Sequence, residues 1–299
     1  MRSRTCRYAA LLVAMICVPA VCSAGDVTAA AEEPDPRSLR RRNTAVIGGI
    51  VLGVGGYGAM NWWNEGMTSS AWPRSEGWFG QGTYAGGSDK LGHAYITYGG
   101  TRLLARAFEG LGNEAADSLK LAGLTTFGVM TGVELVDSFS SKWRFSIEDT
   151  VFNAAGVALA LAMEKYPSLD ALVDFRLLYR RSGDARRLGT NDPLGDYSGQ
   201  TYLLAFKLDG VPRLRDLPLA RYLELQAGYG TRGYELNDGV KSDPHRRVSY
   251  GVAVNVSRLL GDTLFRGGLR GGRIQGAADT FLEFLQVPGT TALRHHRLP

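Results

Sequence analysis

Asp89 and His93 are the residues of this sequence whose types and spacing most directly suggest chemistry. Residues four apart lie on one face of a helix, so the carboxylate could orient the imidazole and hold one tautomer. That arrangement is typical of a general base or a metal ligand. The structural alternative is a helix start, in which Ser88 or Asp89 caps the helix and His93 is simply polar. Lys90 would point elsewhere on the helix and could contact phosphate or a lipid headgroup.

Two more polar pairs follow at helical spacing. Glu134 and Asp137 lie one turn apart at the end of an apolar segment, and Asp149 and Asn153 lie four apart at the start of the next. Ser146-x-x-Asp149 forms a capping pair, which is a complete structural explanation for Asp149.

Glu134 has no such explanation, because it lies among apolar residues where an unpaired carboxylate is costly. We therefore expect it to have a partner, and the candidates are His93, Lys90 and Arg144.

Together these residues predict one shared polar site. Its predicted catalytic residues are Asp89, His93, Glu134 and Asp149, and its predicted substrate contacts are Lys90, Asp137, Arg144 and Asn153. Carboxylate and imidazole ligands suit zinc or a harder divalent ion, and the sequence does not choose between them. A divalent metal is thus a candidate cofactor, not an identified one.

Four helices are expected to position the site, over residues 45–60, 88–108, 117–136 and 146–166. They are rich in Ala and Gly, as closely packed or membrane-embedded helices are. The first is barely long enough to span a bilayer, and Trp62 and Trp63 at its end suit a membrane interface. A buried core helix is the alternative.

The same stretch contains Gly53-x-Gly55-x-x-Gly58, but no crossover helix follows, which excludes a dinucleotide-binding fold.

Beyond about residue 190, apolar residues alternate with others near 202–208, 222–227 and 248–256, which predicts strands. They are too few for a closed single-chain barrel. The sequence thus predicts an α+β protein: a membrane-associated bundle of about four helices followed by a small antiparallel β-sheet. The other histidines, His245, His295 and His296, are expected in a loop and a tail.

The N-terminus reads as an export signal over residues 1–24, and it contains all three cysteines. Cleavage after Ala24 is favoured, with lipidation of Cys22 as the alternative. A disordered linker is expected over 25–43, the helical bundle with the polar site over 44–182, and the β-rich region over 190–299. Arg40 to Arg42 precede the first apolar stretch, where the positive-inside rule would keep them cytoplasmic although the N-terminus is exported. We therefore favour a periplasmic helical bundle that is associated with the inner or outer membrane.

The net charge of +5 is scattered along the chain, which argues against a nucleic-acid surface. Membrane lipid or another envelope component is the expected partner, and the sequence identifies no protein partner.

Several motifs in order carry a resemblance to the uncharacterised family of predicted periplasmic lipoproteins (YfiM-like). They are Asp89-Lys90-Leu91-Gly92-His93-Ala94, Glu134-Leu135-Val136-Asp137, Phe145-Ser146-Ile147-Glu148-Asp149, Asn153-Ala154-Ala155-Gly156, Asp196-Tyr197-x-Gly199-Gln200-x-Tyr202 and Gly228-Tyr229-Gly230. The helical part is also similar to VanZ-like membrane proteins, in which the C-terminal strands have no counterpart. The first family has no established activity, so the resemblance bears on fold and location more than on function.

Three functions remain open at this point. The first is a membrane-associated enzyme or metal-assisted hydrolase acting on envelope lipid or glycan. The second is a non-catalytic scaffold in which the same residues form a buried network that fixes helix register. The third is a lipid-binding module that uses the apolar face of the sheet.

Overall fold

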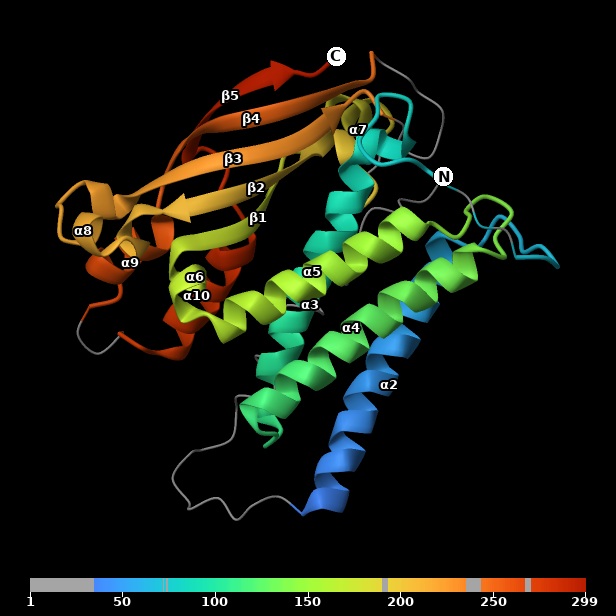
Figure 1. Cartoon of the computed structure of the whole chain (residues 1–299), viewed down its shortest axis with the longest axis horizontal. Coiled ribbons are helices and arrows are strands. Elements are labelled where there is room, and N and C mark those ends of the chain that lie inside the picture. Colours follow the sequence, from blue (N-terminus) through green and yellow to red (C-terminus); the bar gives the residue numbers. More distant parts are fainter. Residues whose placement is uncertain (1–34, 72, 74, 190–192, 235–242, 267–269) are drawn as a thin grey trace. The chain divides into compact units, whose positions relative to one another are not determined.

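A computed structural model describes residues 35–71, 73, 75–189, 193–234, 243–266 and 270–299. Within these residues the protein has nine α-helices and one five-stranded antiparallel sheet (Figure 1). The predicted α+β class and the antiparallel sheet are confirmed. Four of the described helices are long and five are shorter, and the membrane-associated bundle of about four helices stays a prediction. The predicted signal peptide and Cys22 lie outside the described residues.

The chain forms two compact units. One comprises Gly77–Leu91 together with Ala162–Pro299, and the other comprises the described chain up to Glu76 together with Gly92–Leu161. The boundaries fall inside two helices, α3 (Ser88–Gly110) and α5 (Ile147–Lys165), each of which runs on without a break. Each unit is therefore built from segments that are distant in sequence.

The long helices follow the apolar pattern closely at their C-terminal ends. They are α2 (Pro36–Asn61), α3, α4 (Ala115–Asp137) and α5. The start of α2 corrects the sequence prediction, because residues 36–43, expected in the disordered linker, are helical. Pro36 occupies the first turn, where its missing N–H costs nothing. The Asp35 side chain caps the helix by accepting the N–H groups of Arg37 and Ser38.

Small residues let the helices of the second unit approach closely. A Cβ atom on Gly156 of α5 would collide with the carbonyl oxygen of Ala94 and with Oγ1 of Thr97, both on α3. At the other side of the unit, Trp63 Nε1 donates to Asp137 at 2.5 Å and Trp143 Nε1 donates to the Trp62 carbonyl at 3.0 Å. The predicted close packing of glycine-rich helices is thus present between α3 and α5.

Two of the described helices, α2 and α4, are long and apolar enough to cross a membrane by length and composition alone. Core helices of soluble proteins meet the same criterion, so this finding does not choose between the two interpretations of α2.

The sheet belongs to the first unit and follows the order of the sequence. Its strands are β1 (Val173–Tyr179), β2 (Gln200–Lys207), β3 (Leu223–Arg232), β4 (His245–Val254) and β5 (Thr291–Arg297), and each pairs antiparallel with the next. Strand β1 lies within residues 44–182, so the prediction that this whole segment belongs to the helical bundle was wrong. His295 and His296 lie in β5 and His245 opens β4, so the prediction of a loop and a tail for these histidines was wrong.

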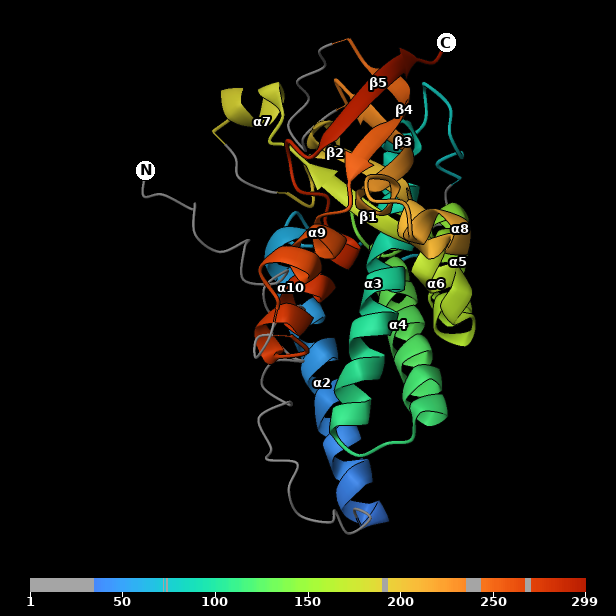
Figure 2. The same cartoon turned by 90° about the vertical axis from the view of Figure 1, so that its left-hand side faces the viewer.

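The short helices also belong to the first unit. They are α6 (Pro167–Leu172), α7 (Gly183–Arg187), α8 (Pro212–Arg215), α9 (Val256–Thr263) and α10 (Arg273–Phe284). Helix α10 lies beside α9 and packs against β1 (Figure 2). The chain after α10 is tied to β1 by a hydrogen bond from the Gln286 N–H to the Leu177 carbonyl of 3.0 Å.

A charged network lies buried on the inner face of this sheet. Arg176 on β1 contacts Asp174, and its Nη1 donates to Glu224 on β3 at 2.8 Å and to Gln286 at 3.2 Å. Lys207 on β2 donates to the second oxygen of Asp174 at 2.6 Å. Because each buried charge has a charged partner, the polar face is stable out of contact with water.

Candidate functional site

The first turn of α3 carries Asp89 and Lys90. The Asp89 carboxylate accepts a hydrogen bond of 2.6 Å from the Tyr197 hydroxyl, a residue of the same unit. Burial, and then the neighbouring charge of Asp89, raise the pKa of Tyr197 well above its ordinary value, so the phenol keeps its proton and donates. Lys90 is fully buried, with Nζ 3.6 Å from Asp89. That burial argues against the predicted contact with phosphate or a headgroup.

Helix α3 then places His93 one turn beyond Asp89, on the same face. Nδ1 of His93 lies 3.1 Å from Oδ1 of Asn153, which is fully buried on α5. An amide oxygen only accepts hydrogen bonds, so Nδ1 carries the proton. In the neutral ring, Nε2 therefore presents its lone pair, as a base or a metal ligand requires.

Glu134, near the end of α4, faces this nitrogen. Its Oε1 lies 3.7 Å from His93 Nε2, and its Oε2 accepts a hydrogen bond of 3.1 Å from the Ser146 N–H. Of the three partners expected for Glu134, the structure thus places His93 beside it. Burial raises the pKa of Glu134 to about 8, and the charge of Asp149 adds to this rise while that of His93 opposes it. At neutral pH Glu134 is therefore mostly protonated and can act as a proton donor.

Asp149 lies in the first turn of α5. Its N–H donates to Ser146 Oγ at 3.2 Å, which is the predicted cap. The N–H of Ser146, which would complete a reciprocal capping box, donates to Glu134 instead. Capping therefore accounts for the backbone of Asp149 but not for its carboxylate.

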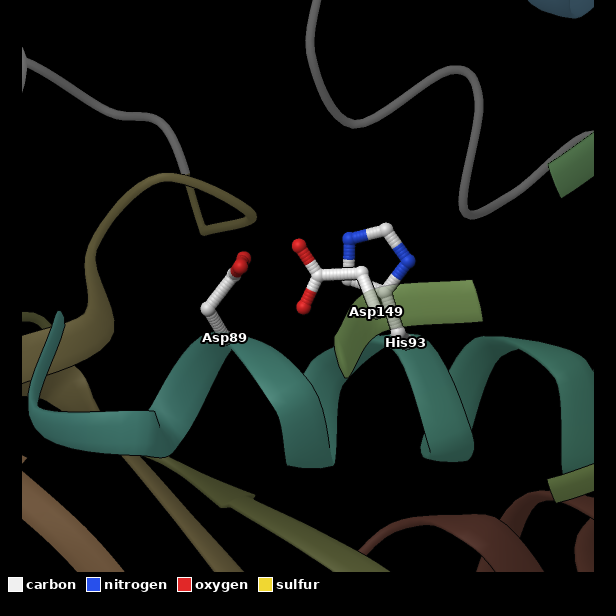
Figure 3. A group of neighbouring side chains, drawn as sticks. All are labelled: Asp89, His93 and Asp149. Atoms are coloured by element: carbon white, nitrogen blue, oxygen red, sulfur yellow. The ribbon is translucent and has the colours of Figure 1, made fainter. Parts of the chain in front are cut away.

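Asp89, His93 and Asp149 form a group that could hold a metal ion. One potential ligand atom from each lies within 4.8 Å of the others. Figure 3 shows Asp89 and His93 rising from one face of α3, with the Asp149 carboxylate beside the imidazole and one ring nitrogen turned toward the two acids. Ligand atoms at about 2.1 Å from a tetrahedral zinc ion lie about 3.4 Å apart, so side-chain movements of up to about 1.4 Å would complete the site.

Two predicted substrate contacts also have structural partners, and their role toward a substrate stays a prediction. Asp137 accepts the hydrogen bond from Trp63, and Arg144 Nη1 donates to the Ser140 carbonyl at 2.9 Å. Sequence reasoning also missed Glu148, which is buried and accepts a hydrogen bond of 2.5 Å from Ser75. Glu148 adjoins Asp149, but on a helix start it reads as an ordinary first-turn acid. Tyr197 lies far along the chain from α3, and no spacing signal joins it to Asp89.

The residues that surround His93 fall inside a segment that matches a family model. Residues 75–165 match the model of a protein family described as predicted periplasmic lipoprotein (DUF2279). The match covers about a third of the chain and shows that this segment is similar to that family. All the predicted site residues lie within the matched segment, whereas the sheet lies outside it. Comparison with curated proteins and with solved structures gave no match.

The family description agrees with export to the periplasm and with association with a membrane, as the signal sequence predicted. It names no activity. The similarity of the helical part to VanZ-like membrane proteins stays a prediction, as do the roles of the site residues.

Proposed function

We propose that this envelope protein binds a divalent cation through Asp89, His93 and Asp149 and uses it to hydrolyse an envelope lipid or glycan. The observation that carries the proposal is the convergence of two buried carboxylates and one partly buried imidazole within 4.8 Å. Three protein ligands with a position left for water are typical of catalytic zinc sites. A nitrogen among the ligands favours zinc or manganese over calcium or magnesium, which take oxygen ligands.

The surrounding residues fit roles in such a reaction. Asn153 holds the His93 ring by its Nδ1–H and thereby directs Nε2 toward the cation. A bound cation would lower the pKa of a coordinated water molecule and supply the nucleophile. Glu134, kept protonated by burial, would give its proton to the leaving-group oxygen as the ester or glycosidic bond breaks. Glu134 would regain the proton that the attacking water releases, so the net reaction adds hydroxyl to one product and a proton to the other.

Cation binding is the part of the proposal to test first. Chelator-treated protein would be titrated with Zn²⁺, Mn²⁺ and Mg²⁺ in a calorimeter, and each titration repeated with Asp149→Asn. The matched control is Asp117→Asn, which alters an exposed acid on α4 that pairs with Lys120. We expect one site, weakened at least about tenfold by Asp149→Asn and unchanged by the control. Equal cation affinity of Asp149→Asn and Asp117→Asn would show that Asp149 is not a ligand and would contradict the proposed site.

Hydrolysis is tested separately. Metal-loaded protein and its His93→Gln variant would be incubated with envelope lipid and peptidoglycan extracts, and the products compared by mass spectrometry. Products formed by the native chain alone support the proposal. No product from either extract, despite confirmed cation binding, rejects the catalytic step and leaves a structural cation site.

A scaffold function also has a specific observation in its favour. His93, Glu134 and Asn153 tie together α3, α4 and α5 through their side chains, which a register-fixing network would do. The two functions differ in thermal unfolding. A cation at about 100 times its dissociation constant stabilises a binding protein by about 2.7 kcal/mol, whereas a purely structural network gains nothing from it.

A further inference from the structure

The sheet of the first unit has an unusual distribution of polar and apolar side chains. Along β3, Glu224 is fully buried, whereas the neighbouring Leu225 is 51% exposed. Along β4, Ser249 is buried, whereas Tyr250 and Val252 are about half exposed. Antiparallel sheets with one solvated face normally place apolar residues inward and polar residues outward. Here the alternation is reversed, as in sheets whose outer face contacts lipid.

The strand register joins the exposed residues into one surface. Leu225 pairs with Phe206 on β2 and with Val252 on β4. We call this surface the outer sheet face; its exposed apolar residues are Leu204, Phe206, Leu223, Leu225, Val248, Tyr250, Val252 and Val254. Contiguous apolar surfaces of this kind on soluble proteins mark interaction sites.

Buried charge pairs on the inner face fix which residues of this sheet face outward. Arg176 lies between Asp174 and Glu224, and all three are buried. Turning Leu225 inward by a one-residue slip would move Glu224 and its neighbours outward and break this network. The reversed pattern is therefore fixed by buried charge pairing.

The charges around the outer sheet face are complementary to anionic lipid. At the register positions of this face, β5 carries Arg294 and His296, opposite Tyr250 and Val248. His296 stacks on the Tyr250 ring at 5.3 Å. None of the outward positions in the described strands β2 to β5 is Asp or Glu. Basic side chains next to an apolar surface are attracted to anionic headgroups while the apolar surface enters the acyl region.

The loop before β3 also exposes large apolar side chains. Leu219 is 79% exposed and Leu217 is 49% exposed, and Arg213 and Arg215 precede them, with Asp216 between. Leucines displayed in this way beside arginines are typical of shallow insertion at a membrane interface.

We infer that the outer sheet face docks face-on, as a surface contact, onto an anionic membrane leaflet. The sheet does not cross the bilayer, because its edges β1 and β5 leave backbone groups that hydrocarbon could not satisfy. This contact is independent of the proposed cation site. It would hold the protein against a membrane by a surface outside the segment that matches the lipoprotein family.

Lipid photolabelling of the full chain tests this contact directly. The protein would be mixed with vesicles of phosphatidylethanolamine and phosphatidylglycerol whose acyl chains carry a diazirine, and the labelled peptides identified by mass spectrometry after irradiation. We expect labels in β3 and β4 at outward residues. Leu225→Glu should lower this labelling at least about tenfold, since the change removes an apolar contact and adds a charge to the lipid-facing surface.

The matched control is Leu188→Glu, which places the same charge at an exposed leucine after α7, outside the sheet. Circular dichroism checks that both variants fold. Equal labelling of β3 and β4 in the two variants, or an absence of label there, overturns the inference, even where α2 is labelled. Chemical crosslinks between β4 strands of two chains, with no lipid label, would assign the outer sheet face to a second copy and likewise overturn it. Labelling that persists unchanged in vesicles of phosphatidylcholine alone would contradict the role given to Arg294 and His296.

Discussion

The raised pKa of Glu134 makes a quantitative prediction about stability. In the cation-free protein, its pKa rises from 4.5 unfolded to about 8 folded. The unfolded chain therefore loses this proton at lower pH than the folded chain does. Stability is fully present below pH 4.5 and is lost progressively as the pH rises to about 8. At about 1.4 kcal/mol per pH unit, the loss is at most about 5 kcal/mol.

Glu134→Gln removes the titrating group but keeps an acceptor for the Ser146 N–H. Urea denaturation with a chelator present would be measured for both proteins at pH 5 and pH 9. We expect similar stabilities at pH 5 and a clear advantage for the variant at pH 9, approaching a few kcal/mol. The comparison cancels other groups that titrate over this range. Parallel stability curves for the two proteins would refute the proposed burial of a proton at Glu134.

Three further predictions concern packing, the site and the sheet. Gly156→Ala should destabilise the protein by about 1–3 kcal/mol in urea, because its Cβ would collide with α3. Gly128→Ala in α4, which meets nothing within 4 Å, should be neutral or slightly stabilising, and equal losses for the two would contradict the described packing. Asn153→Ala should weaken cation binding about 10–100-fold, measured by competition with a fluorescent chelator, since His93 loses its orienting partner; unchanged affinity argues against that role. Arg176→Ala should cost about 3–5 kcal/mol in urea, because it removes the charged partner of the buried Glu224 and leaves Asp174 with Lys207 alone, and a smaller loss at pH 8 than at pH 5 would contradict this cause.

Much of the helical part could be predicted from sequence because its helices are bounded by local signals. Ser146 caps α5, and Pro167 lies two residues beyond its last residue, Lys165. The start of α2 was missed because its first turns lie in an exposed charged stretch, where apolar periodicity gives no signal. Strand β1 was missed because its alternation of apolar and charged residues covers only Val173 to Leu177 and directly follows a helical segment.

In the site, too, local spacing was predictable from the sequence, whereas contacts between distant residues were not. The i, i+4 spacing on α3 and α5 predicted that Asp89 and His93, and separately Asp149 and Asn153, would share a face. That Glu134 needed a partner followed from burial alone, but the choice of His93 depended on how the helices pack. Tyr197 could not be connected to Asp89, since their contact joins residues far apart in sequence. Asp137 and Arg144 were included because of their charge, although their partners are an indole and a backbone carbonyl.

The contact between Asp89 and Tyr197 also bears on the order of events during export. The segment Gly77–Leu91 folds with residues 162–299, yet seventy residues separate the two in the chain. An exported polypeptide crosses the inner membrane progressively from one end, and contacts of such long sequence separation form late. The turn that carries Asp89 can be completed only after Tyr197 and the strands that follow it have been delivered. If translocation stops before the sheet is exported, the long helices can fold in the periplasm, but the turn that carries Asp89 lacks its contact with Tyr197.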